Sequence, residues 1–154
     1  MATGDIVVFN AAKVALGNKL IDFDSDTFKF ALVTSAVTPT ADAAAPHFGG
    51  TGTTNYATNQ VTPGGNYTSG GPSLTSLAYT DITGVIHWQA QKVTIAQHAS
   101  NPTNARWGII FNDTDTNKRA VAYVDLGSAR DLSAGPFEFR FNAVDGVGTI
   151  VTVS

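Results

Sequence analysis

The chain has 154 residues, with nine Lys and Arg, twelve Asp and Glu, three His and no Cys, giving a formal net charge of −3. This length predicts one domain over 1–154. The lack of cysteine excludes disulfides, thiolate metal sites and cysteine nucleophiles. The acidic balance offers no basic field for nucleic acid or an anionic membrane, so we expect neither as a direct partner.

The start of the chain predicts a strand followed by a short helix. An apolar run at 5–9 precedes Asn10, which we expect to be the N-cap of a helix over 11–16. Gly17 or Asn18 is expected to close this helix in a left-handed conformation. The first residues lack the basic and apolar regions of a signal peptide, and no run approaches the ~18 apolar residues of a membrane span. We therefore expect a soluble protein made in the cytoplasm.

Period-two alternation of apolar residues predicts most of the strands. The segment 27–34 places Phe28, Phe30 and Leu32 on one face, which predicts a strand with that face buried. The clearest alternation is 137–141, with three Phe on one face and a Glu/Arg pair on the other. Further strands are expected at 74–80, 83–91 and 91–95, and at 149–153 after a glycine-rich turn at Gly146 and Gly148.

Two apolar runs, 106–111 and 119–127, predict an antiparallel hairpin whose turn is the polar stretch 112–118. Large side chains lie on both faces of these strands, so the hairpin belongs at the centre of a two-layered structure. With about eight strands and one short helix, the predicted fold is all-β and mainly antiparallel: a β-sandwich or jelly-roll-like domain.

The segment 36–72 predicts a long loop or arm, because Ala, Thr, Pro, Gly and Asn dominate it. Seven of the fifteen Gly of the chain fall between positions 49 and 71. Loops of this length are uncommon in compact domains and are usually binding elements or disordered. We therefore expect either a mobile, solvated loop or an arm that orders against a neighbouring subunit.

Two acidic stretches resemble the beginning of a calcium-binding loop. The first, Asp22-x-Asp24-x-Asp26, has Thr27 at position six and Val33 at position twelve, where Gly and Glu are required. It is therefore interpreted as a solvated strand edge.

The second stretch, Asp113-x-Asp115-x-Asn117, has Lys118 at position six. It is interpreted as the polar turn of the central hairpin, with a weak surface cation as the alternative.

The remaining candidates give no catalytic signature. His47, His87 and His98 have no metal-ligand spacing, and no Gly-x-Ser-x-Gly elbow is present. His87 is expected to be a half-buried strand residue. Six aromatic side chains in the predicted strands are expected to form a β core, with a carbohydrate- or base-stacking platform as the alternative. That group comprises Trp88, Trp107, Tyr123, Phe137, Phe139 and Phe141. We predict no catalytic, cofactor-binding or metal residue, no cofactor and no enzymatic activity.

Several segments together resemble a family of small virion proteins of tailed bacteriophages, and they follow the same order over nearly the whole chain. They are 10–17, 21–22, 26–35, 66–71, the strand containing Trp88, 106–113, 122–127 and 137–150. The segment 36–72 departs from the family pattern, so no loop contact carries over to it. No site residue transfers either.

The resemblance implies a non-enzymatic structural protein of the virion, and specifically a capsid decoration (cement) protein. It would lie on the capsid surface, contact the major capsid protein and self-associate as a homo-oligomer, with a trimer expected. The last strand, 150–153, and the 36–72 arm would reach neighbours by strand addition. Charged residues make up only 14% of the chain, about half the usual share, which independently suits permanent protein contacts. The alternatives are a tail, neck or fibre component and a carbohydrate-binding module.

Overall fold

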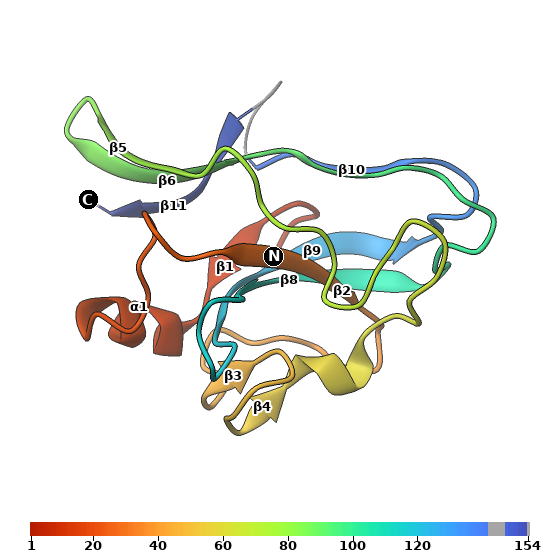
Figure 1. The fold of residues 1–154 in the computed structure, drawn as a ribbon, viewed down its shortest axis with the longest axis horizontal. Coiled ribbons are helices and arrows are strands. Elements are labelled where there is room, and N and C mark those ends of the chain that lie inside the picture. The colour runs from red at the N-terminus through yellow and green to blue at the C-terminus, as the bar shows by residue number, and fades with distance from the viewer. Residues whose placement is uncertain (142–146, 154) are drawn as a thin grey trace.

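The computed structural model describes residues 1–141 and 147–153, and this part of the chain is mostly β (Figure 1). The elements in chain order are β1 (Ile6–Val8), α1 (Asn10–Gly17), β2 (Phe28–Val33), β3 (Pro46–His47), β4 (Thr54–Asn55), the 3-10 helix η1 (Tyr56–Asn59), β5 (Ala78–Ile82), β6 (Val85–Gln91), β7 (Val93–Ile95), β8 (Ala105–Asn112), β9 (Ala120–Arg130), β10 (Phe137–Phe139) and β11 (Val147–Val153). No helix in these residues is both long and apolar enough to cross a membrane.

The main sheet has four antiparallel strands in the order β1-β9-β8-β2. Its centre is the predicted hairpin, with Trp107 opposite Asp125 and Ile109 opposite Tyr123. Nearly every residue of β8 is buried, as is β9 from Ala120 to Leu126, which confirms the central position that the two-sided apolar pattern predicted. Strand β9 runs on to Arg130, beyond the predicted end at Gly127.

Strands β5, β6, β10 and β11 lie over one face of the main sheet, whereas the two-stranded sheet of β3 and β4 lies on its other side (Figure 1). A three-stranded antiparallel sheet has the order β11-β6-β5, and β7 pairs with β10 in a ribbon that follows it. Aromatic rings join the two layers: Phe28 of β2 meets Trp88 of β6 edge-on with centroids 4.7 Å apart, and Phe30 of β2 stacks on Phe139 of β10 at 5.3 Å. These aromatic residues therefore form part of a shared core between the two β layers.

The segment 137–141 has the predicted facing, but its strand, β10, ends at Phe139, two residues before the predicted end. Phe137, Phe139 and Phe141 are buried, while Glu138 and Arg140 form an ion pair of 3.1 Å on the outside. In β2, by contrast, both faces are buried from Phe30 to Val33, so the prediction of a single buried face was incomplete. The last strand begins at Val147, two residues before its predicted start, and the predicted turn residue Gly146 lies outside the described residues.

Helix α1 forms where it was predicted, but its caps differ. It begins at Asn10 itself, and the N-cap residue is Phe9, which makes no side-chain cap. Phe9 is fully buried and its N–H donates to the Val121 carbonyl at 3.0 Å, so the extended backbone of β1 is held until the residue before the helix. At the other end the left-handed residue is Lys19, with φ 57°, and not Gly17 or Asn18.

The segment 36–72 is not an extended loop in the structure. It contains β3, β4 and η1, and its buried anchors are Tyr56, Val61 and Tyr67. The hydroxyl of Tyr67 accepts a hydrogen bond from the Leu32 N–H at 2.9 Å. The segment thus packs on its own domain through these buried side chains.

Candidate functional site

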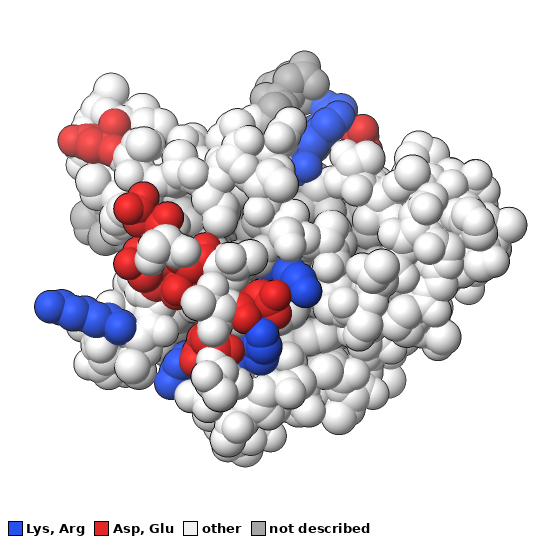
Figure 2. Space-filling view, viewed as in Figure 1, with Lys and Arg blue, Asp and Glu red and all other residues white. Residues whose placement is uncertain are grey.

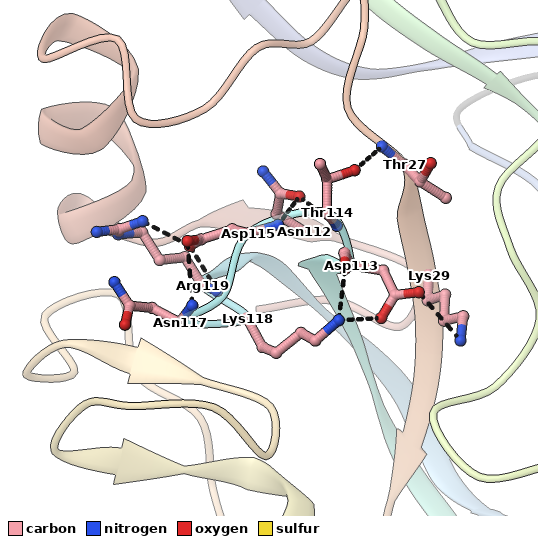
Figure 3. Close-up of polar contacts among 9 residues, drawn as sticks. All are labelled: Thr27, Lys29, Asn112, Asp113, Thr114, Asp115, Asn117, Lys118 and Arg119. Carbon is pink, nitrogen blue, oxygen red and sulfur yellow. Dashed lines mark hydrogen bonds and ion pairs between the residues drawn. The ribbon is translucent and has the colours of Figure 1, made fainter.

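The polar turn of the β8–β9 hairpin is held by its own side chains (Figure 3). Asn112 Oδ1 accepts hydrogen bonds from the N–H groups of Thr114 and Asp115, at 2.9 and 3.0 Å. Asp115 in turn accepts from the Asn117 N–H at 3.1 Å and pairs with Arg119 at 2.5 Å. These contacts confirm the interpretation of this stretch as a turn built on Asn and Asp side chains.

Asp113, in the same turn, lies between two lysines. Its carboxylate is 2.8 Å from Lys118 Nζ and 3.2 Å from Lys29 Nζ. Burial opposes the charge on this carboxylate, but the hydrogen bonds from Lys118 and Lys29 outweigh it and hold the pKa of Asp113 below its usual value. The carboxylates of the hairpin turn therefore have cationic partners from the chain itself.

The 22–26 stretch is a turn and not a strand edge. Asp22 Oδ1 accepts from the Asp24 N–H at 2.9 Å, and this bond lowers the pKa of Asp22. Asp26 Oδ2 accepts from the Asp22 N–H at 2.9 Å and from Asn112 Nδ2 at 2.6 Å. The acidic side chains thus close the turn and tie it to the hairpin, whereas Ile21 and Phe23 enter the core.

The three histidines occupy separate environments. His87 is half-buried in β6, as predicted, with Nδ1 3.0 Å from the Thr149 hydroxyl. His98 is exposed and accepts a hydrogen bond from the Ser100 N–H at 3.0 Å. His47 is 4% exposed, and its Nδ1 has no hydrogen-bond partner among the described residues. Across residues 1–141 and 147–153, no three His, Cys, Asp or Glu side chains come together in a group that could hold a metal ion.

The aromatic residues considered as a stacking platform are buried. Trp88, Trp107, Tyr123 and the three Phe of 137–141 are each 8% exposed or less, as expected for a β core. Tyr79, at 43%, is the one aromatic among the large exposed apolar side chains of the described residues. A sugar or base would need an exposed ring face, which these six residues do not offer.

Charged side chains gather on one part of the face shown in Figure 2, where acidic and basic groups lie side by side, while much of the remaining visible surface is uncharged. We therefore consider the open edges of the sheets, and not the charged groups, as the candidate binding surface. A strand edge presents unpaired N–H and C=O groups, and these specify another extended backbone as their partner.

The β2 edge of the main sheet is covered by the chain itself. Main-chain bonds join Val61 N–H to the Leu32 carbonyl at 3.1 Å, and Phe30 N–H to the Pro72 carbonyl at 2.9 Å. The segment 59–74 therefore closes this edge. Its Ala, Thr and Gly composition did not reveal that role, because the pairing is with a strand some 30 positions away.

The opposite side of the molecule has two edges that face each other across a groove. Among the described residues, β1 pairs only with β9, and β11 pairs only with β6. A hollow of about 610 Å³ lies between them, lined by Ile6 and Val8 of β1, Leu16 of α1, Phe23, and residues 149–152 of β11. The one charged group in its lining is Lys13. This groove with its two strand edges is the candidate functional site.

Sequence reasoning predicted that the last strand would pair with a neighbour, and it did not predict the groove beside it. The uncharged, β-branched composition of 147–153 was the available signal.

The chain matches no protein-family model, and no curated protein and no solved structure matches it.

Proposed function

We propose that this protein is a non-enzymatic structural component of a phage virion, specifically a capsid decoration protein that stabilises the head by bridging capsid subunits. The observation that carries the proposal is the asymmetry of the sheet edges. The edge at β2 is closed by residues of the same chain, whereas β1 and β11 border a groove in whose lining Lys13 is the one charged residue. This is the arrangement expected of a domain that accepts an extended segment from a neighbour.

The mechanism is mechanical. Two β layers packed through aromatic rings, in the manner of a β-sandwich or jelly roll, form a rigid body. Strand addition at the groove attaches this body to the major capsid protein or to another copy, and binding of the folded state stabilises the whole assembly by mass action. The resemblance to phage virion proteins supports this role and suggests a homotrimer on the outer surface of the capsid.

The structure leads us to assign a different role to the 36–72 segment from the arm that was expected. A segment whose Tyr56, Val61 and Tyr67 anchors are buried in its own domain is not available to reach a neighbouring subunit. We therefore assign bridging to the β11 side of the molecule alone. The 36–72 segment supports bridging indirectly, because it covers the β2 edge and so prevents that edge from pairing with other strands.

The test is binding to phage heads that lack this protein. Purified protein is mixed with such heads, unbound protein is removed by sedimentation, and the temperature at which the heads release their DNA is measured. We expect saturable binding and a higher release temperature. Heads that neither bind the protein nor gain thermal stability would contradict a decoration role.

A tail, neck or fibre component would use the same edges and is the second candidate. It would bind tails or necks in the same sedimentation assay and leave the release temperature of heads unchanged. A carbohydrate-binding module is the third, and a glycan array with no hits would count against it. The burial of the six aromatic residues considered as a platform does not favour this last alternative.

A further inference from the structure

We propose that the groove between β1 and β11 binds an extended segment of a partner protein, which pairs with the main chain of β1 and places an acidic side chain against Lys13. This inference rests on the proposed function, because it names the chemistry of the segment that the groove accepts. Three features of the described residues support it: main-chain groups of β1 that point away from the sheet, a lining of half-buried apolar side chains, and a lysine without an ion pair.

The main chain of β1 has hydrogen-bonding groups that face the groove. The N–H of Phe9 and the carbonyl of Asp5 both bond to β9, at 3.0 and 3.4 Å. Hydrogen-bonded and non-hydrogen-bonded pairs alternate along an antiparallel ladder, so Ile6 and Val8 direct their N–H and C=O groups away from β9. Ile6 and Val8 line the groove, whereas Val7 does not. A strand added at this edge would therefore find two main-chain positions to pair with.

The apolar lining of the groove has room for the side chains of such a segment. Ile6, Val8, Leu16 and Val151 line it, and each is a partly buried apolar residue packed against the core. The volume of about 610 Å³ lies within the range of ligand-binding pockets, roughly 300–1,000 Å³. An added strand would remove this apolar surface from water. Main-chain pairing distinguishes a peptide from a lipid, because only a peptide offers matching N–H and C=O groups.

Lys13 gives the groove its one positive charge. It lies one turn before Leu16 on α1, and both residues line the groove. Its Nζ is 3.4 Å from Asn10 Oδ1, and none of the ion pairs among the described residues includes it. An ammonium group beside apolar surface attracts a carboxylate more strongly than it does in open solvent, because less water lies between the charges. The matching partner is therefore a segment with one acidic side chain among apolar ones.

Acidic groups close to the groove restrict where that carboxylate can lie. Asp22 and Asp24 line a second hollow, which shares Leu16 and Phe23 with the groove. A partner carboxylate placed next to these aspartates would be repelled, whereas one placed next to Lys13 would be attracted. Charge complementarity of this kind fixes the register of a bound segment.

The test compares two exposed lysines of the same region. Lys13→Glu reverses the charge in the groove, and Lys19→Glu makes the same change in net charge at the neighbouring hollow, outside the groove lining. Affinity for phage heads that lack this protein is measured by sedimentation over a range of protein concentrations. We expect Lys13→Glu to weaken binding at least about tenfold and Lys19→Glu to bind within about twofold of wild type. The difference should decrease at high salt.

A carbodiimide crosslink identifies the partner carboxylate directly. This reagent joins a lysine to an Asp or Glu side chain only where the two groups touch. Protein bound to heads should therefore give a crosslink from Lys13 to an acidic residue of a head protein, which mass spectrometry detects. Crosslinks to head proteins through other lysines only would overturn the proposal.

Main-chain pairing is tested by a second pair of variants. Ile6→Pro removes an N–H that faces the groove, at the first residue of an edge strand, where Pro is tolerated; Ile6→Val keeps that N–H. We expect Ile6→Pro to bind heads about fivefold more weakly than Ile6→Val. Urea unfolding checks that both variants are folded, and equal affinities of the two folded proteins would overturn the pairing with β1.

Equal affinities of Lys13→Glu and Lys19→Glu for heads would overturn the proposal, whether or not Ile6→Pro folds. If both lysine variants bind like wild type and still raise the DNA release temperature, the acidic segment is refuted and the decoration role stays intact. Wild-type protein that does not bind heads would contradict the decoration role, and this partner with it.

Discussion

The ring of Phe30 in β2 lies over Gly108 in the neighbouring strand β8, in the space that a Cβ on residue 108 would occupy. Phe30 is fully buried and also stacks on Phe139 of the other layer. The glycine is therefore required for close packing of this ring between the layers, and not for any unusual backbone conformation.

Gly108→Ala should destabilise the fold by about 1–3 kcal/mol, because the added methyl group forces the Phe30 ring out of its packed position. Urea unfolding measures the change. Gly17→Ala is the matched control: a Cβ at residue 17, at the end of α1, meets no atom within 4 Å. It should leave stability unchanged or raise it by up to about 1 kcal/mol. Equal stabilities of the two variants would contradict the packing argument.

Tyr67→Phe tests the attachment of the 36–72 segment to β2. It removes the hydroxyl that accepts the buried Leu32 N–H, and leaves that donor without this partner. We expect a loss of about 1–3 kcal/mol in the free energy of unfolding. The exposed Tyr79 serves as the control, since Tyr79→Phe should change stability by less than about 0.5 kcal/mol. A neutral Tyr67→Phe would show that the hydroxyl does not fix the segment.

Stability should fall in alkaline solution between about pH 10 and about pH 12. Burial raises the pKa of Tyr67 to about 12, and burial together with the nearby Tyr123 raises that of Tyr56 to about 12. In this range the unfolded chain has released phenol protons that the folded chain retains, so unfolding releases protons and becomes more favourable as pH rises. Urea unfolding at about pH 9 and about pH 11 should show a smaller fall for Tyr67→Phe than for wild type. The same fall in both would exclude Tyr67 as a contributor.

Asp125 should contribute to stability at neutral pH and lose that contribution in acid. A hydrogen bond from Arg106 is the main cause that lowers the pKa of Asp125, and the Gly127 N–H donates to the same carboxylate at 2.6 Å. Because the folded pKa lies below the value of 3.8 expected when unfolded, the unfolded chain binds the proton first as pH falls.

The stabilisation by Asp125 is therefore complete well above pH 3.8 and declines below it. Asp125→Asn should lower stability at neutral pH, and the difference from wild type should shrink as the pH is lowered. Urea unfolding of both proteins over that range measures the difference. A difference independent of pH would mean that the loss comes from packing and not from the ionised carboxylate.

The central hairpin was predictable because its signal is local and strong. Two apolar runs with large side chains on both faces and a polar turn between them leave few alternatives to a buried pair of strands. The alternation at 137–141 is similarly unambiguous, and the structure buries all three of its Phe.

The errors arose where a distant contact outweighs a local preference. Asn10 is a favourable N-cap residue, but the bond from Phe9 N–H to Val121 starts the helix one residue earlier than the cap rule predicted. The segment 36–72 has the composition of a loop, yet its backbone closes the β2 edge. Pairing across such sequence distances has no signature in composition alone.

The candidate site was only half predictable for the same reason. The last strand, 150–153, was expected to meet a neighbour as part of the assembly role that the resemblance to phage virion proteins implies. The groove beside it is made by β1, α1 and Phe23, which lie more than 120 residues earlier in the chain. The groove exists only because β1 of the main sheet and β11 of the three-stranded sheet lie on the same side of the molecule.

Electron cryomicroscopy of virions that contain this protein tests the central claim most directly. The account predicts density for the domain on the outer surface of the head, arranged with the symmetry of the shell and with its β11 side against a neighbouring subunit. Density for the domain confined to the tail, neck or fibres would contradict a decoration role.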